Sequence, residues 1–101
     1  MAIINLTVEN FDETIKNGKT LVDFFATWCG PCKMLAPVIE EVAAQASGYA
    51  TVAKVDVDQE RTLAIRYNIS SIPTIIVFEN GLEINRLVGI EPKETYLAAI
   101  K

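Results

Sequence analysis

Two cysteines separated by two residues are the part of this sequence best suited to chemistry. Cys29 and Cys32 are the only cysteines among 101 residues, and Gly30 and Pro31 stand between them. Two thiols at this spacing can close a small disulfide ring and open it again, because one thiolate attacks a disulfide and the other resolves the mixed disulfide that forms. The pair therefore predicts an enzyme of dithiol–disulfide exchange.

Two other uses of the pair remain open on the residues alone. A structural disulfide across so short a loop would add little stability. A metal site needs more ligands than two cysteines, and because the sequence contains no histidine, such a site would have to bridge two chains. The lack of histidine also excludes Ser-His and Cys-His nucleophiles. No nucleotide-binding motif is present, so we expect no bound cofactor and no metal.

The elements around the pair place Cys29 at the start of a helix. The segment before it, Leu21–Ala26, is almost continuously apolar, which is typical of a strand buried on both faces. An apolar stripe at helical spacing follows the pair and ends at Gly48, and Pro37 is expected to kink this helix. Unpaired N–H groups at a helix N-terminus stabilise a thiolate there. We expect an exposed attacking thiol at Cys29 and a shielded resolving thiol at Cys32.

The rest of the chain alternates between strands and helices. Strands are predicted over Ile3–Leu6, Leu21–Ala26, Thr51–Val57, Thr74–Glu79 and Leu82–Val88. Helices are predicted after an N-cap at Thr7 (with Val8, Phe11 and Ile15 on one face and Gly18 at the end), after the cysteine pair, over Glu60–Tyr67 and over Pro92–Lys101. The strand–helix–strand unit across the pair predicts parallel pairing, and Asn80-Gly81 predicts a tight hairpin. We expect one α/β domain over residues 1–101.

Composition excludes several classes of partner. Half of the residues are hydrophobic, which predicts a packed core. The formal net charge is -4, so nucleic acid is not expected as a partner. No stretch approaches the roughly 20 apolar residues of a membrane span. Met1–Thr20 has no basic start and no apolar run of a signal peptide. We therefore expect a cytoplasmic monomer that does not bind membranes.

Several segments together resemble the thioredoxin family, from about Ile3 to Leu97. They are Val22-Asp23-Phe24, Trp28-Cys29-Gly30-Pro31-Cys32-Lys33-Met34, Val55-Asp56-Val57-Asp58, Ser71-Ile72-Pro73-Thr74, Asn80-Gly81 and Val88-Gly89. The resemblance implies the thioredoxin fold, a central mixed five-stranded sheet flanked by four helices. It also implies reduction of disulfides in target proteins, after which thioredoxin reductase, a flavoprotein that uses NADPH, restores the dithiol.

The resemblance assigns roles to two charged residues in predicted strands. Asp23 interrupts an apolar strand, and by itself it fits a functional buried acid, a satisfied structural aspartate or an aspartate at a strand end that faces water. The matching aspartate of the family lies behind the resolving cysteine and accepts its proton. Lys54 by itself is most simply a solvated lysine. The family places the matching lysine near this aspartate, where its charge partly offsets the cost of burying the acid.

The resemblance also implies a substrate-binding surface. The proline that matches Pro73 is cis in the family and packs beside the cysteines, which leaves the peptide group of Ile72 free to pair with an extended target segment. A shallow apolar surface is expected around Cys29, although the same residue types would fit an ordinary core. Its members are Trp28, Gly30, Pro31, Ile72, Pro73, Gly89 and Ile90.

Departures from the family pattern, among them Phe25 and Ile90, and two alternative functions accompany the resemblance. Phe25 stands where many members have a second tryptophan, and Ile90 stands where a small residue is common, which could narrow the choice of partner. The first alternative is a disulfide oxidase or isomerase, although Gly-Pro between the cysteines favours a reductant by family analogy. The second is a binding module within a larger assembly, for which the redox chemistry is secondary.

Overall fold

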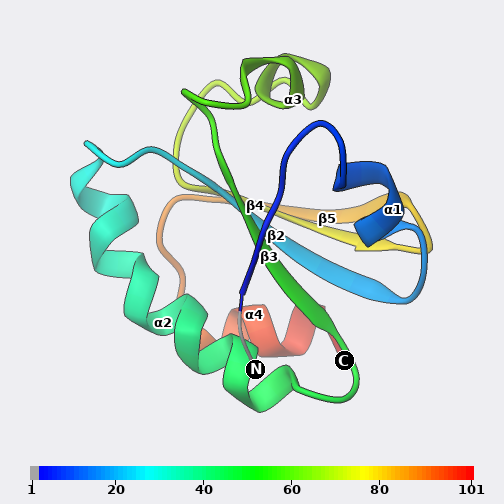
Figure 1. Cartoon of the computed structure of the whole chain (residues 1–101). Helices are drawn as coiled ribbons and strands as arrows, with labels where there is room; N and C mark the ends of the chain where they lie inside the picture. Colours follow the sequence, from blue (N-terminus) through cyan, green and yellow to red (C-terminus); the bar gives the residue numbers. More distant parts are fainter. Residues whose placement is uncertain (1–2) are drawn as a thin grey trace.

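A five-stranded mixed sheet forms the centre of the structure, which is a computed structural model that describes residues 3–101 (Figure 1). The strands are β1 (Ile4–Asn5), β2 (Lys19–Phe25), β3 (Thr51–Asp56), β4 (Thr74–Glu79) and β5 (Leu82–Val88). Their order across the sheet is β1-β3-β2-β4-β5. β3 runs parallel to both β1 and β2, whereas β4 runs antiparallel to β2 and β5.

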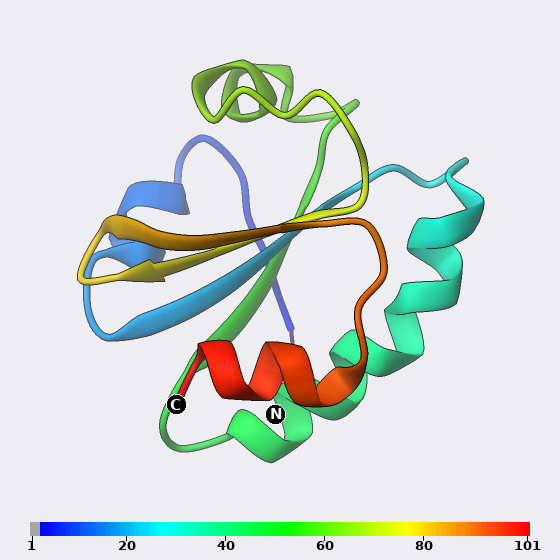
Figure 2. The ribbon, with the colours of Figure 1, turned by 180° about the vertical axis from the view of Figure 1, so that it is seen from behind.

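Four helices cover the two faces of this sheet within the described residues. They are α1 (Phe11–Ile15), α2 (Gly30–Ala46), α3 (Arg61–Arg66) and α4 (Lys93–Ala99). α2 and α4 lie on one face, and α1 and α3 lie on the other (Figures 1 and 2). This arrangement confirms the predicted fold class. None of the helices in residues 3–101 is long and apolar enough to cross a membrane.

The central strand β2 contributes to the core on both faces. Leu21 packs with residues of α2 and α4, whereas Val22 and Phe24 pack with residues of α1 and α3. Because side chains alternate along a strand, Asp23 lies on the same face as Leu21, beneath α2. The predicted burial of this strand on both faces is therefore confirmed, and it brings one carboxylate into the core.

The hairpin between β4 and β5 follows the sequence prediction. Asn80 and Gly81 both have positive φ, at 51° and 87°. Left-handed backbone at both central positions is what a tight two-residue hairpin requires, and Asn-Gly supplies it with the least strain. The turn therefore reverses the chain so that β5 pairs antiparallel with β4.

The beginning of the first helix differs from the prediction. Thr7 is not the N-cap, because α1 begins only at Phe11 and Asn10 precedes it. The amide oxygen of Asn10 accepts hydrogen bonds from the Thr7 N–H at 2.7 Å and from the Thr7 hydroxyl at 3.4 Å. These bonds close a turn before the helix, and they leave Val8 exposed rather than on the buried face.

Other boundaries differ by one or two residues, at the ends where hydrogen bonding is weakest. β1 spans Ile4–Asn5 rather than Ile3–Leu6. Pro92 is the residue before α4 rather than part of its first turn. Pro37 lies inside α2, which continues through it to Ala46.

Candidate active site

Cys29 and Cys32 form a disulfide at the N-terminus of α2. Their Cα atoms are 5.2 Å apart. Cys29 is the N-cap residue, with extended backbone, and its Sγ accepts a hydrogen bond from the Cys32 N–H at 3.2 Å. Pro31 occupies the first turn of α2, where its missing N–H costs no helical hydrogen bond. The predicted position of Cys29 at a helix N-terminus is confirmed.

The predicted difference in exposure between the two cysteines is wrong for this disulfide form. Each is only 5% exposed. Phe25, Val57 and Ile72 pack against the cluster that the pair forms, and the disulfide ties the sulfur of Cys29 to that of the buried Cys32. The two cysteines differ instead in what they face, because Cys32 lines a cavity that contains a carboxylate and Cys29 does not.

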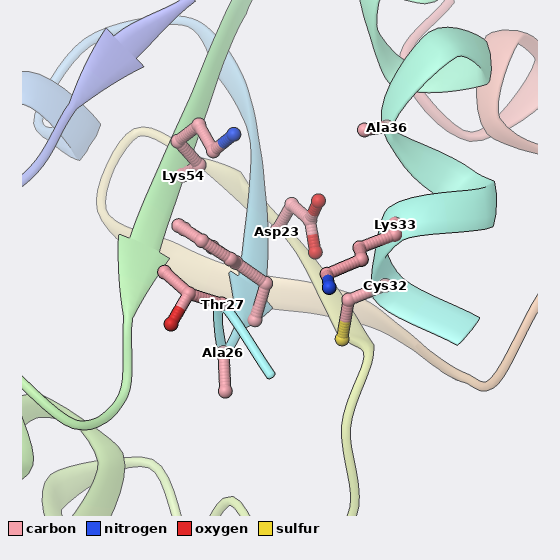
Figure 3. A pocket seen from close by; sticks show the side chains of 8 residues that line it. Asp23, Ala26, Thr27, Cys32, Lys33, Ala36 and Lys54 are labelled. Atoms are coloured by element: carbon pink, nitrogen blue, oxygen red, sulfur yellow. The ribbon is translucent and has the colours of Figure 1, made fainter. Parts of the chain in front are cut away.

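This cavity, of about 240 Å³, lies between β2, β3 and the start of α2 (Figure 3). Asp23 projects into it and is only 3% exposed, and its Oδ1 has no hydrogen-bond partner among the described residues. Burial raises the pKa of Asp23 to about 7, while the charge of Lys54 lowers it and so offsets part of the rise. A carboxylate in this state can exchange a proton near neutral pH. The full lining is Asp23, Phe25, Ala26, Thr27, Cys32, Lys33, Ala36 and Lys54.

Lys54 lies directly opposite Asp23 in the parallel register of β2 and β3. Figure 3 shows the two side chains extending from neighbouring strands to the same side of the sheet, with the Asp23 carboxylate directed toward α2. The Lys54 Nζ lies 4.4 Å from the centroid of the Phe25 ring. No carboxylate oxygen in residues 3–101 lies within 4.0 Å of this Nζ. Lys54 therefore lowers the pKa of Asp23 as a nearby charge and not through a direct ion pair.

The Ile72–Pro73 peptide bond is cis, and Pro73 is buried. The carbonyl oxygen of Pro73 accepts a hydrogen bond from the Gly89 N–H at 2.8 Å. Gly89 has a φ of 87°, a conformation that glycine adopts without strain. The Tyr96 hydroxyl donates to the Gly89 carbonyl at 3.4 Å, so α4 also supports this loop. These bonds hold the loop after β5 against the loop before β4.

The predicted substrate-binding residues differ in their exposure and in whether they line a hollow. Trp28 is 69% exposed, and it lines a hollow of about 410 Å³ together with Ile72. Gly30, Pro31 and Ile90 are exposed but do not line this hollow, and Gly89 is half-buried. Pro73 is buried, so it supports the surface from below rather than forming part of it. The other lining residues are Val57, Asp58, Arg61, Ala64, Ile65, Ile69 and Ser70.

Several residues near the site were not singled out from the sequence. The Trp28 Nε1 donates a hydrogen bond to Asp58 Oδ2 at 2.7 Å. The sequence could have indicated this contact, because both residues follow parallel neighbouring strands whose carboxyl ends meet at one edge. Nothing in the sequence indicates that Arg61 and Ile65 line the hollow beside Trp28, since that depends on how α3 lies over the sheet edge. Among the described residues, no group of three histidine, cysteine, aspartate or glutamate side chains could hold a metal ion.

Comparisons with known proteins agree with this geometry. The sequence model of the thioredoxin family matches residues 2–101. The chain is 48% identical over 101 residues to a thioredoxin of Staphylococcus saprophyticus, covering all of this chain and 97% of that protein. It is 52% identical over 94 residues to a thioredoxin of Staphylococcus haemolyticus, covering 93% of this chain and 90% of that one.

A solved structure shows the same likeness in three dimensions. A mutant thioredoxin from Halobacterium salinarum NRC-1 superposes with a TM-score of 0.89 at 34% identity, covering 99% of this chain and 92% of that chain. With the disulfide of Cys29 and Cys32 at the start of α2, these likenesses settle the class of protein. The chain belongs to the thioredoxin family and is a thiol–disulfide oxidoreductase.

Proposed function

We propose that this chain reduces disulfide bonds in target proteins, with Cys29 as the attacking thiol and Cys32 as the resolving thiol. One observation carries the division of roles. The cavity that holds Asp23 is lined by Cys32 and not by Cys29. A group able to accept a proton near neutral pH therefore faces only one of the two thiols, which is the one that must be deprotonated second.

The first step is attack of the Cys29 thiolate on a target disulfide. A bond forms between Cys29 Sγ and one target sulfur, the target disulfide breaks, and the other target sulfur leaves as a thiolate that takes a proton from water. The position of Cys29 at the N-terminus of α2 supports this role, because the N–H of Cys32 already donates to its sulfur and the helix dipole favours negative charge there.

The second step releases the target. The ionised carboxylate of Asp23 accepts the proton of the Cys32 thiol, and the resulting thiolate attacks Cys29 Sγ. The bond between Cys29 and the target breaks, the target sulfur leaves as a thiolate, and the Cys29–Cys32 disulfide forms. Two electrons have then passed from the dithiol to the target. The charge of Lys54 supports this step because it keeps Asp23 ionised at a lower pH than burial alone would allow.

A complete cycle needs a source of electrons. We propose that thioredoxin reductase returns two electrons from NADPH to the Cys29–Cys32 disulfide, as family membership suggests, and that this takes place in the cytoplasm, where such a supply keeps thiols reduced. The target would dock on the surface around Cys29 that includes Trp28, Gly30, Pro31, Ile72, Gly89 and Ile90, with Pro73 beneath it. The exposed indole of Trp28 beside a hollow supports this placement.

Two matched serine variants test the assignment. With thioredoxin reductase, NADPH and insulin, Cys29→Ser should abolish disulfide reduction and should form no mixed disulfide. Cys32→Ser should also lose turnover, but it should accumulate a mixed disulfide with the target that mass spectrometry locates on Cys29. Turnover by Cys32→Ser at the parent rate, or a mixed disulfide on Cys32 in Cys29→Ser, would contradict the proposed roles.

A further inference from the structure

We propose that Phe25 is a positioning residue of the exchange reaction, because its ring holds the Lys54 ammonium beside Asp23. Without the ring, the ammonium would be drawn to Asp56, which lies two residues further along the same strand. This inference rests on the proposed role of Asp23 as the proton acceptor of Cys32, and it adds a residue that controls how strongly Lys54 acts on that acceptor.

Four side chains from two neighbouring strands lie next to one another on one face of the sheet. In the register of β2 and β3, Asp23 pairs with Lys54 and Phe25 pairs with Asp56. Each strand contributes residues two positions apart, so all four side chains lie on the same face. Lys54 thus has one carboxylate directly opposite and another along its own strand. Phe25 is diagonal to Lys54, at a separation that an aromatic side chain can span.

The ring is the close partner of the ammonium. The Lys54 Nζ lies 4.4 Å from the Phe25 ring centroid, inside the roughly 6 Å over which a cation is attracted to an aromatic face. Among residues 3–101, Lys54 makes no hydrogen bond through Nζ and no ion pair within 4.0 Å. The contact that holds the ammonium is therefore the one with the ring rather than one with either acid.

Phe25 and Lys54 together separate two cavities. Both residues line the cavity that contains Asp23. Both also line a second cavity of about 220 Å³, whose lining includes Asp56 and Glu60. The two acids of the second cavity already accept main-chain N–H bonds, which hold them in place as fixed negative charges. If the ring were removed, the Lys54 ammonium would be attracted by two fixed acids in the second cavity and by Asp23 alone in the first.

The other titratable groups around Asp23 are held in place by elements other than the Phe25 ring. Lys33 faces the cavity from α2, and the disulfide-bonded Cys32 does not titrate. Tyr96 approaches from α4, and its phenol pKa is raised chiefly by burial and in small part by the charge of Asp23. On β4 the residue paired with Asp23 is the apolar Ile75. Phe25 itself lines the cavity, so a smaller side chain there also reduces the burial of Asp23, which lowers its pKa, whereas withdrawal of the Lys54 charge raises it.

The experiment is a titration of Asp23 in the oxidised protein, followed by the NMR signal of its carboxyl carbon. Phe25→Leu should move the midpoint upward by about 0.5 to 1 pH unit, the size expected when a unit charge retreats by a few ångströms at an effective dielectric constant near 20. Phe25→Tyr and Phe25→Trp keep an aromatic face and should leave the midpoint close to that of the parent. Lys54→Met should give the largest upward shift.

A double variant shows whether the ring acts through the lysine. In the Lys54→Met background, Phe25→Leu should add no further upward shift, because the charge that the ring positions is gone. An unchanged midpoint in Phe25→Leu, or an equal shift with and without Lys54, would overturn the proposal. The exposed ring of Tyr49 provides a matched control, since Tyr49→Leu removes an aromatic ring far from the cavity and should leave the midpoint unchanged.

The parent protein gives a check that needs no variant. Protons of the Lys54 side chain that lie over an aromatic ring should be shifted upfield by its ring current, and random-coil shifts would contradict the contact. The titration is also independent of catalysis. If Phe25→Leu moves the Asp23 midpoint but Asp23→Asn leaves the resolving step unchanged, the positioning effect is real and the proposed role of Asp23 is wrong.

Discussion

The indole Nε1 of Trp28 donates a 2.7 Å hydrogen bond to Oδ2 of Asp58, which joins the segments that follow β2 and β3. The bond fixes the orientation of a side chain that is 69% exposed and directly precedes Cys29. An exposed aromatic ring held in one position presents apolar area to a partner at a low cost in conformational entropy. Asp58 thus orients one member of the proposed docking surface.

Removing the acceptor should weaken docking of target proteins. Asp58→Ala is expected to lower kcat/KM about two- to fivefold, mainly through KM, because an exposed hydrogen bond to a charged group contributes only about 0.5–1 kcal/mol. Trp28 is the only tryptophan, so its fluorescence anisotropy reports the release of the ring directly. Asp58→Asn keeps an oxygen acceptor and serves as the control. Parent-like anisotropy in Asp58→Ala would mean that other contacts hold the ring.

The resolving step should follow the ionisation of Asp23. Below the pKa of about 7 the carboxyl carries its own proton and cannot accept that of Cys32, whereas above it the carboxylate can. Asp23→Asn should therefore slow decay of the mixed disulfide at least about tenfold at pH 8 and remove the inflection near pH 7 from the rate profile. Rapid acid quenching followed by mass spectrometry measures this decay. A profile identical to that of the parent would exclude Asp23 from proton transfer.

The same carboxyl should make stability fall as pH rises. The folded protein binds the Asp23 proton more tightly than the unfolded chain does, since burial raises its pKa from 3.8 to about 7. The stabilisation is complete below about pH 4 and is lost as pH rises through 7. At pH 8 the buried charge costs up to about 4 kcal/mol, at about 1.4 kcal/mol per pH unit. Asp23→Asn in the oxidised protein should flatten this slope in urea unfolding, and a slope retained by the variant would assign it to another group.

The loop that holds Gly89 against Pro73 should lose stability when its glycine gains a side chain. Gly89 has a φ of 87°, and an added Cβ would meet no atom within 4 Å, so the cost of Gly89→Ala comes from the backbone alone. We expect a loss of about 1–2 kcal/mol in urea unfolding. Gly30→Ala is the matched control, because Gly30 also has open space around it but lies in α2 without a positive φ. Equal effects of the two substitutions would show that backbone strain is not the cause.

The sequence by itself determined the elements and the reacting pair. Neighbouring residues were enough to predict the apolar run of β2, the Asn80-Gly81 turn and the strand–helix–strand unit. Alternation, helical spacing and turn chemistry are local properties of a chain. The position of Cys29 at a helix N-terminus followed from the same patterns and is what the structure shows. The predicted start of α1 was wrong because the Asn10 side chain accepts a hydrogen bond from the Thr7 N–H and closes a turn there, so that the helix begins only at Phe11.

The tertiary structure decided which groups meet. Trp28 and Asp58 are 30 residues apart, and Lys54 and Phe25 are 29 apart, so their contacts depend on strand order and register rather than on any local pattern. The equal burial of Cys29 and Cys32 also came from packing, since Phe25, Val57 and Ile72 reach the disulfide from separate elements. Residue spacing identifies which sulfurs can react, but the desolvation and charge that tune Asp23 exist only once β2, β3 and α2 enclose it.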